Sequence, residues 1–288
     1  MPACSSARRL AVLAVLLCGA MLFMLHHQTH PTSPPVTKHP APTDAQNSTL
    51  GFSKILVLNT PARRDRLRNM QALARHHGLR FEYPGTVSRQ EADRQAGSQG
   101  YLLEGTHLAC YLSHLHALRH IVDHHVATAL ILEDDIDVEW DLKHLHARVM
   151  RQAAHVDWDM LFLGHCTLDA NEPAGEKSAE VYAAEYPMCM HAYAVTWECA
   201  RRLVVVLEER LRTVGREIDL VIAVGVRFGV STVLGVRPPY VVQVGRRELR
   251  SDLTAASEGD TAQRLRNSTL YRLGLRASNP QSFAPYIA

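Results

Sequence analysis

The stretch Val126-Ala127-Thr128-Ala129-Leu130-Ile131-Leu132, followed at once by Glu133-Asp134-Asp135, decides the fold. The apolar run has the length and composition of a strand that is buried on both faces in a parallel sheet. Three carboxylates at its end lie where open α/β sheets bind their ligands. Because alternate side chains of an extended chain share a face, we expect Glu133 and Asp135 to point one way and Asp134 the other.

Three like charges packed together repel one another, and a hard cation that prefers oxygen ligands would relieve the repulsion. Glu133, Asp134 and Asp135 are therefore the candidate metal ligands. A cation held there could also bind a diphosphate and offset the charge that grows on it as it leaves. The other interpretation of the same residues is an acidic loop that is solvated and inert.

The composition bounds the class of protein. The chain has 288 residues, of which 47% are hydrophobic and 21% charged, which is enough for one sizeable core with a tail to spare. The net charge of +2 gives no electrostatic case for a nucleic-acid partner. The aromatic content of 6% also argues against a base-stacking surface.

The first 53 residues indicate a membrane anchor and a stem. Residues 1–9 end in two arginines, and residues 10–25 carry no charge, a pattern typical of a secretory signal or a signal anchor. No clear cleavage pattern follows, so we favour a retained anchor over a cleaved signal. Residues 26–53 are rich in Pro, Thr, Ser and His and read as a flexible stem. This organisation predicts a single-pass type II protein of the Golgi or ER membrane with a lumenal domain.

The remaining chain predicts one α/β domain. Strands are expected at 54–58, 81–85, 126–132, 157–164, 191–195, 226–230 and 240–244, and helices at 65–77, 106–123, 142–153, 199–211 and from 218. Thr106 is the expected N-cap of the second helix, and residues 88–104 carry no clear pattern. Alternating strands and helices favour three layers around a mostly parallel sheet, with a domain over 54–255 and a C-terminal extension over 256–288.

Cysteine usage fits an oxidising compartment. Cys110, Cys166, Cys189 and Cys199 fall in the expected lumenal part, and a Cys166–Cys189 pair would clip the loop between two core segments. The cysteine spacing matches no structural zinc pattern.

Several motifs, taken in order, resemble glycosyltransferase family 25. They are Asn59-Thr60-Pro61-Ala62-Arg63-Arg64-Asp65-Arg66, then Gly105 to Ser113-His114, then the intact Leu132-Glu133-Asp134-Asp135. Thr60 stands where the family has leucine, and Ala109 where it has glycine. The later motifs Trp158-Asp159, Leu163 to Cys166, His191-Ala192-Tyr193, Pro239 with Gln243, and Ser251-Asp252 look like the fungal, membrane-anchored branch.

The resemblance implies a GT-A fold, a UDP-sugar donor, Mn²⁺ or Mg²⁺ as cofactor, and inversion at the anomeric carbon. UDP-galactose is the donor of the best-known relatives. The acceptor would be a glycan or glycoprotein hydroxyl. Asn59 and Arg63 follow the first strand, where nucleotide contacts are usual. With Asp65, Arg66, Ser113 and His114 they form the candidate donor-binding set, although Arg63 could pair with Asp65 instead of phosphate, and Ser113 and His114 could hold a loop.

An inverting transfer needs a base that faces the acceptor hydroxyl. Asp219 is the first candidate, with Asp252 and His165 as alternatives. Two other functions compete with the transferase. An inactive lumenal relative would bind glycans or a partner without turnover. A metal-dependent phosphohydrolase would use the same carboxylates, but it would usually need further ligands from other strand ends.

Overall fold

The computed structural model describes residues 47–166, 180–229, 231–244 and 265–276. The expected anchor at 10–25, most of the stem, and Asp252 lie outside these ranges. Within them, no helix combines the length and the apolar character that crossing a bilayer requires.

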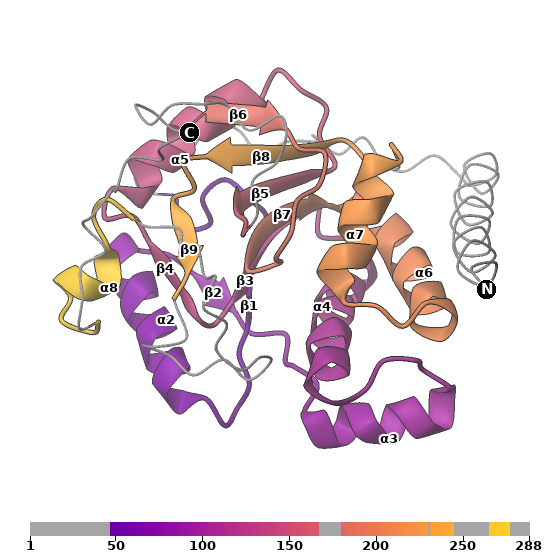
Figure 1. The fold of residues 1–288 in the computed structure, drawn as a ribbon. Helices are drawn as coiled ribbons and strands as arrows, with labels where there is room; N and C mark the ends of the chain where they lie inside the picture. Colours follow the sequence, from indigo (N-terminus) through magenta and orange to yellow (C-terminus); the bar gives the residue numbers. More distant parts are fainter. Residues whose placement is uncertain (1–46, 167–179, 230, 245–264, 277–288) are drawn as a thin grey trace, which may run out of the picture.

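The described residues form strands and helices in alternation (Figure 1). Their bounds are β1 (Lys54–Leu58), α2 (Arg64–His77), β2 (Phe81–Glu82), α3 (Arg89–Gln99), α4 (Gly105–Asp123), β3 (Thr128–Glu133), β4 (Ile136–Val138), α5 (Leu142–Ala153), β5 (Met160–Gly164), β6 (Glu180–Ala183), β7 (Ala192–Thr196), α6 (Trp197–Thr213), α7 (Ile218–Arg227), β8 (Val233–Arg237), β9 (Val241–Gln243) and α8 (Thr269–Arg272).

The central sheet is mixed. Its seven strands have the order β2-β1-β3-β7-β5-β8-β6. β2, β1 and β3 run parallel, as do β5 and β8, but β7 is antiparallel to both β3 and β5, and β6 is antiparallel to β8. Three of the six strand pairs are parallel and three are antiparallel, so the sheet is mixed and the expectation of a mostly parallel sheet is met only in part. Apolar periodicity shows that a segment is a strand, but it does not encode the direction in which the strand runs.

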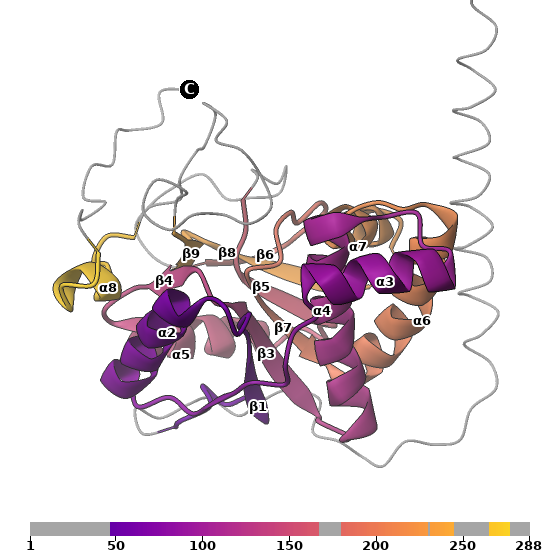
Figure 2. The ribbon, with the colours of Figure 1, turned by 90° about the horizontal axis from the view of Figure 1, so that it is seen from below.

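The sheet is the middle of three layers, as the alternation predicts. One face packs against α4, α6 and α7, and the other against α2 and α5 (Figures 1 and 2). The two cores divide the residues of β3 in strict alternation: Ala129 and Ile131 face α4, whereas Leu130 and Leu132 face α2 and α5. Since both faces of β3 are covered, its sequence is a continuous apolar run.

The acidic motif follows directly from this packing. Glu133 is the last residue of β3, next in the series that faces α4, and Asp134-Asp135 form a tight turn into β4. β4 leaves the main sheet and pairs in antiparallel fashion with β9, so that Ile136 lies opposite Gln243. The expected position of the three carboxylates at the carboxyl end of a buried strand is confirmed.

The structure corrects one expected helix start and shows a helix in the segment that had no clear pattern. α4 begins at Gly105 and has Glu104 at its N-cap, so Thr106 is not the cap. The unassigned segment 88–104 contains α3, which begins at a Ser88 side chain that accepts a hydrogen bond from the Glu91 N–H. Ser88 and Glu91 have the spacing of a capping box, which is the signal that could have located this helix.

The expected strand at 226–230 is also wrong. α7 continues through Arg227, and the next strand, β8, starts at Val233. Ile222 and Val226 are one turn apart and buried in the core with α4 and α6. Burial of this helical face outweighs the strand preference of the β-branched residues. Edge strand β6 was not expected, because its half-exposed residues carry no alternation that marks a buried face.

The last described segment is fastened to β4 by two carboxylates. Asp137 is fully buried and accepts hydrogen bonds from the Ser268 hydroxyl, the Leu270 N–H and the Arg276 guanidinium. Glu139 accepts from the N–H groups of Arg266 and Asn267 at 2.6 Å and 2.9 Å. Residues 265–276 therefore complete the layer that contains α2 (Figure 1).

Candidate active site

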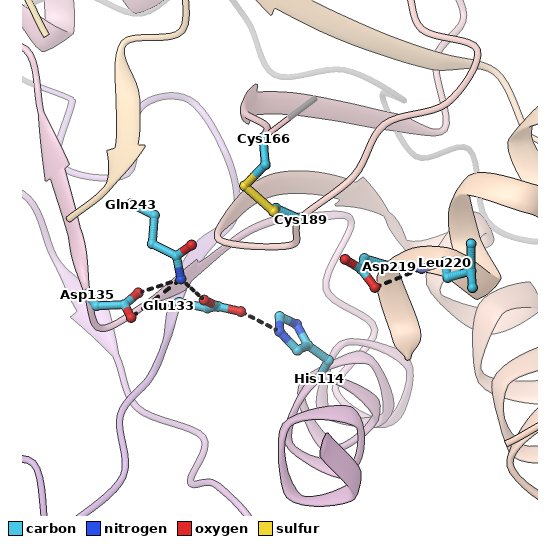
Figure 3. The surroundings of a disulfide bond; sticks show 8 residues. All are labelled: His114, Glu133, Asp135, Cys166, Cys189, Asp219, Leu220 and Gln243. Carbon is cyan, nitrogen blue, oxygen red and sulfur yellow. Dashed lines mark hydrogen bonds and ion pairs between the residues drawn. A yellow bond between two sulfur atoms is a disulfide. The ribbon is translucent and has the colours of Figure 1, made fainter. Parts of the chain in front are cut away.

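Glu133 and Asp135 direct carboxylate oxygens to a common point. Gln243 on β9 places its amide nitrogen 3.3 Å from Glu133 Oε2, and 3.3 Å and 3.4 Å from the two oxygens of Asp135 (Figure 3). One donor is thus shared among three acidic oxygens. The expectation that these two side chains point the same way is confirmed.

Asp134 points elsewhere and is engaged with protein groups. Its Oδ1 accepts from Arg66 Nη1 at 2.8 Å, and its Oδ2 accepts from Asn59 Nδ2 at 2.7 Å. The same Arg66 nitrogen lies 3.2 Å from Asp135 Oδ2. Arg66, Asp134 and Asp135 form a buried triad, and each of their side chains is 8% exposed or less. Asp134 therefore fixes the turn from behind, and Arg66 is the internal counter-ion of the acidic motif.

The other predicted donor-binding residues of the first motif lie beside this triad. Arg63 pairs with Asp65 through two hydrogen bonds of 3.1 Å and 2.9 Å. This ion pair lowers the pKa of Asp65 to about 2. Asn59 Nδ2 also contacts the carbonyl oxygen of Arg63 at 3.3 Å, so the residue that holds Asp134 also holds the start of α2. The sequence motif thus works as one local structure that supports the acidic turn.

His114 connects the acidic pair to the core. Its Nε2 lies 3.2 Å from Glu133 Oε1, and its Nδ1 lies 3.2 Å from the Tyr193 hydroxyl. The ring is 1% exposed. In the neutral tautomer that satisfies both contacts, Nε2–H donates to the carboxylate and the tyrosine O–H donates to Nδ1. His114 therefore orients Glu133 from the side opposite Gln243 (Figure 3).

Ser113 holds a loop. Its hydroxyl donates to the Ala109 carbonyl at 2.7 Å and accepts from the Val87 N–H at 2.9 Å. The buried serine thereby ties the segment after β2 to α4. Of the two roles left open by its sequence, the structure shows the loop-holding one.

The three carboxyl groups have different proton affinities. Burial alone would raise the pKa of Glu133, but the hydrogen bond from His114 and the nearby positive charges outweigh it and lower the pKa. Burial, followed by the charge of Glu133, raises the pKa of Asp135 to about 7. Burial also raises the pKa of Asp134, although Arg66 opposes the rise. Neighbouring carboxyl groups with separated pKa values are typical of functional sites.

The candidate bases occupy distinct places. Asp219 lies in the first turn of α7, on the other side of His114 from Asp135 in the view of Figure 3. Its Oδ1 accepts from the Leu220 N–H at 2.8 Å, and its Oδ2 has no hydrogen-bond partner among the described residues. His165 is 2% exposed and its Nε2 lies 3.2 Å from the Tyr182 hydroxyl. Asp252 falls within 245–264, outside the described ranges.

The expected disulfide is present. Cys166 and Cys189 are bonded and join the end of β5 to the segment before β7, next to the carboxylates in Figure 3. His191 follows two residues later, and its carbonyl oxygen accepts from the Glu133 N–H at 2.9 Å. The disulfide and this backbone bond fix the strand that lies beside the acidic motif.

The sequence places Tyr193 and Gln243 in motifs that resemble the family, but it predicts no contact for either side chain. Gln243 contacts the acidic motif across the pairing of β4 with β9, whereas Tyr193, on a strand paired with β3, reaches it through His114. Both contacts depend on strand register. Tyr193 could have been found from period-two alternation in its strand, which places it on the α4 face with Phe162 and Ile131. Gln243 could not, because the pairing of β4 with β9 has no local signal.

Comparison with known proteins gives one family. The family model described as "Glycosyltransferase family 25 (LPS biosynthesis protein)" matches residues 52–214. Procollagen galactosyltransferase 2 of Mus musculus is 23% identical over 174 residues, which is 54% of this chain and 28% of that protein. Procollagen galactosyltransferase 1 of Danio rerio is 25% identical over 179 residues, 55% of this chain and 29% of that protein. The chain thus matches less than a third of the length of these relatives.

A solved structure of a glycosyltransferase involved in the glycosylation of the major capsid of PBCV-1 is 14% identical and covers 53% of this chain and 65% of its own. Its TM-score is 0.29.

Proposed function

Because the chain belongs to glycosyltransferase family 25, we propose that it moves a hexose from a UDP-sugar to a glycan or glycoprotein hydroxyl, with inversion and with a divalent cation. Galactose is the first candidate for the sugar, since the curated relatives are named procollagen galactosyltransferases. The observation that carries the proposal is the convergence of Glu133 and Asp135 oxygens on a single point. We further propose that the catalytic layers follow the GT-A plan.

The residues present fit a hard cation. Glu133 and Asp135 offer carboxylate oxygens, the ligands that Mn²⁺ and Mg²⁺ take in proteins. The two groups already share a hydrogen-bond donor, and the raised pKa of Asp135 reflects its burial and, next, the negative charge of Glu133. When bound, a divalent cation would supply positive charge beside the diphosphate leaving group. The geometry favours Asp134 as a support, since both its oxygens are engaged by Arg66 and Asn59.

The surrounding side chains position the acidic pair. His114 donates to Glu133 and is itself held by Tyr193, which fixes the carboxylate in one rotamer. Arg66 keeps the two aspartates together in a site that is nearly closed to water. Arg63 is the residue of the first motif placed to exchange its partner, Asp65, for a donor phosphate, because guanidinium groups bind both in the same bidentate manner.

Asp219 is the proposed base. One of its oxygens is fixed by the backbone of α7, which orients the other for a hydroxyl proton of the acceptor. Its charge reaches the interior of the site: the pKa of the Cys110 thiol is raised first by burial and then by the charges of Glu133, Asp219 and Asp135. The acceptor would then enter from the α7 side and the donor from the side of the acidic turn.

We also propose that the enzyme works in the lumen of the Golgi or ER as a type II membrane protein. The uncharged run at 10–25 after two arginines supports this location. The Cys166–Cys189 disulfide supports an oxidising compartment.

A donor-hydrolysis assay tests the proposed function. We would purify the full chain from a secretory host and measure UDP release from a panel of UDP-sugars with Mn²⁺, Mg²⁺ or EDTA. We expect release from one sugar that requires metal, is faster with an acceptor and is lost in Asp135→Asn. Asp123→Asn, which makes the same change at an exposed residue of α4, is the matched control and should keep full activity.

Absence of UDP release from every sugar by a folded wild-type chain would contradict the proposal and favour the inactive glycan-binding relative. Metal-dependent release of inorganic phosphate without sugar transfer would favour the phosphohydrolase.

A further inference from the structure

A second set of possible metal ligands lies behind the acidic pair. The Cys110 sulfur, a ring nitrogen of His114 and a Glu133 carboxylate oxygen all lie within 4.8 Å of one another. Cys110 and His114 are four residues apart on α4, so they lie on one face of the helix, and Glu133 reaches them from the end of β3. This set differs from the oxygen-only pair of Glu133 and Asp135 because it contains sulfur and nitrogen.

We propose that Cys110, His114 and Glu133 form a binding site for zinc or another thiophilic divalent metal, and that metal bound there inhibits the enzyme. The inhibitory part rests on the proposed function, whereas metal binding does not. The cysteine spacing along the chain carries no zinc pattern, and the site arises only where the helix meets the strand.

The spacing of two ligands already suits zinc. In a tetrahedral site with Zn–N and Zn–O bonds of about 2.0–2.2 Å, the two ligand atoms lie about 3.3 Å apart. His114 Nε2 and Glu133 Oε1 are 3.2 Å apart. A metal would replace the hydrogen bond between these atoms without separating them, and Cys110 would supply the third ligand and water the fourth.

The second contact of His114 also fits. Histidines that bind metals through one ring nitrogen usually donate the other N–H to an oxygen, which fixes the ring. His114 Nδ1 lies 3.2 Å from the Tyr193 hydroxyl. On metal binding the single ring proton would move, by exchange with solvent, from Nε2 to Nδ1. Nε2 would then bind the metal, and Nδ1–H would donate to the tyrosine oxygen.

The charges balance. The Cys110 thiol is half-buried near several carboxylates and, without metal, its pKa is raised by burial and by the charges of Glu133, Asp219 and Asp135. Binding of a dication would release the thiol proton to solvent and create a thiolate. One thiolate and one carboxylate then neutralise the two positive charges, so the buried site carries no net charge.

Glu133 links the two sites and explains inhibition. Its Oε1 faces His114, and its Oε2 faces Gln243 and Asp135. A zinc ion on Oε1 would withdraw negative charge from the oxygen pair and place a dication next to it. Binding of Mn²⁺ by Glu133 and Asp135 should therefore weaken as zinc binds.

Cobalt reports the site directly, because a thiolate ligand gives Co²⁺ a sulfur-to-metal charge-transfer band. We would strip the full chain of metal, keep the disulfide oxidised and titrate Co²⁺, then Zn²⁺. We expect the band at one equivalent and its loss when zinc displaces cobalt. Cys110→Ser should abolish the band. Cys199→Ser, at the other free cysteine of the described residues, is the matched control and should retain it.

A band that persists in Cys110→Ser, or no band in the wild type, would overturn the site. Circular dichroism verifies folding of each variant, and His114→Gln, which should also abolish the band, serves if Cys110→Ser does not fold. For inhibition, zinc is titrated into the UDP-release assay at saturating Mn²⁺. Cys110→Ser should keep its basal rate and require about tenfold more zinc for half-inhibition. Equal zinc sensitivity of both proteins would overturn the inhibitory role, and absence of UDP release altogether would refute the proposed function and leave the cobalt result standing.

Discussion

Replacing Asp135 with asparagine should stabilise the metal-free protein. The wild-type carboxyl group has a pKa raised from 3.8 to about 7 by burial and by the charge of Glu133. Since one pKa unit corresponds to about 1.4 kcal/mol, the full rise corresponds to about 4 kcal/mol of unfolding free energy. Asparagine keeps the shape and removes the charge, while Arg66 retains Asp134 as its partner at 2.8 Å.

The sign of the pH dependence follows from the direction of the shift. Below pH 4 the carboxyl group is protonated in both the folded and the unfolded chain, so it costs nothing. Between pH 4 and 7 the unfolded chain has released this proton and the folded protein has not, so wild-type stability falls by up to about 1.4 kcal/mol per pH unit. Above pH 7 the loss is complete. The advantage of Asp135→Asn should therefore grow from near zero at pH 4 to about 2–4 kcal/mol at pH 8.

Urea denaturation of both proteins from pH 5 to pH 8, with a chelator present, measures this difference. Asp123→Asn is the control and should change stability by less than about 0.5 kcal/mol at every pH, because its side chain is exposed. Addition of Mn²⁺ should stabilise the wild type and leave Asp135→Asn unchanged. An asparagine variant that is no more stable than the wild type at pH 8 would refute the view that crowded negative charge destabilises the metal-free site.

Three further predictions test other parts of the site. Arg66→Met should lower the unfolding free energy at pH 8 by about 3–5 kcal/mol, because it leaves buried carboxylates without their counter-ion. Its control, Arg64→Met on the exposed face of α2, should change the unfolding free energy by less than about 0.5 kcal/mol in the same urea titration. Asp134→Asn should weaken Mn²⁺ binding by about 10–100-fold, as expected for a residue that supports the ligands. Electron paramagnetic resonance of free Mn²⁺ measures the affinity. Complete loss of binding would instead show that Asp134 is a direct ligand. Replacing both Cys166 and Cys189 with alanine should lower the unfolding free energy by about 3 kcal/mol, since the disulfide closes a loop with a sequence separation of 23. An unchanged midpoint of urea denaturation would show that the disulfide does not constrain the unfolded chain.

The sequence predicted the parts of this fold that depend on local periodicity. The run at 126–132 marked the buried strand, and the three carboxylates marked its functional end. Alternation also predicted that Glu133 and Asp135 share a direction, which Gln243 now reports through its hydrogen bonds. These features need only the geometry of an extended chain and the burial of both sheet faces.

Features that depend on direction or on partners far along the chain could not be predicted. β7 runs antiparallel to its neighbours, and nothing in its alternation distinguishes the two directions. Arg66 is predicted to belong to the donor-binding set, and the structure also shows it buried against Asp134 and Asp135. The sequence could not reveal this contact, because Asp134 lies 68 residues further along the chain. The contacts of Gln243 with Glu133 and Asp135 could not be predicted for the same reason.

The attachment of residues 265–276 to β4 has a consequence for how the protein is made. The hydrogen bonds that Asp137 accepts from this segment require Ser268, which follows 131 residues later in the chain, and Arg276, which comes later still. A ribosome adds roughly 5–20 residues per second, so these partners are synthesised seconds after Asp137. During that interval the carboxylate of Asp137 lacks its hydrogen bonds to the last described segment. A nascent chain stalled before Ser268 would therefore carry every proposed metal ligand and yet have no finished site.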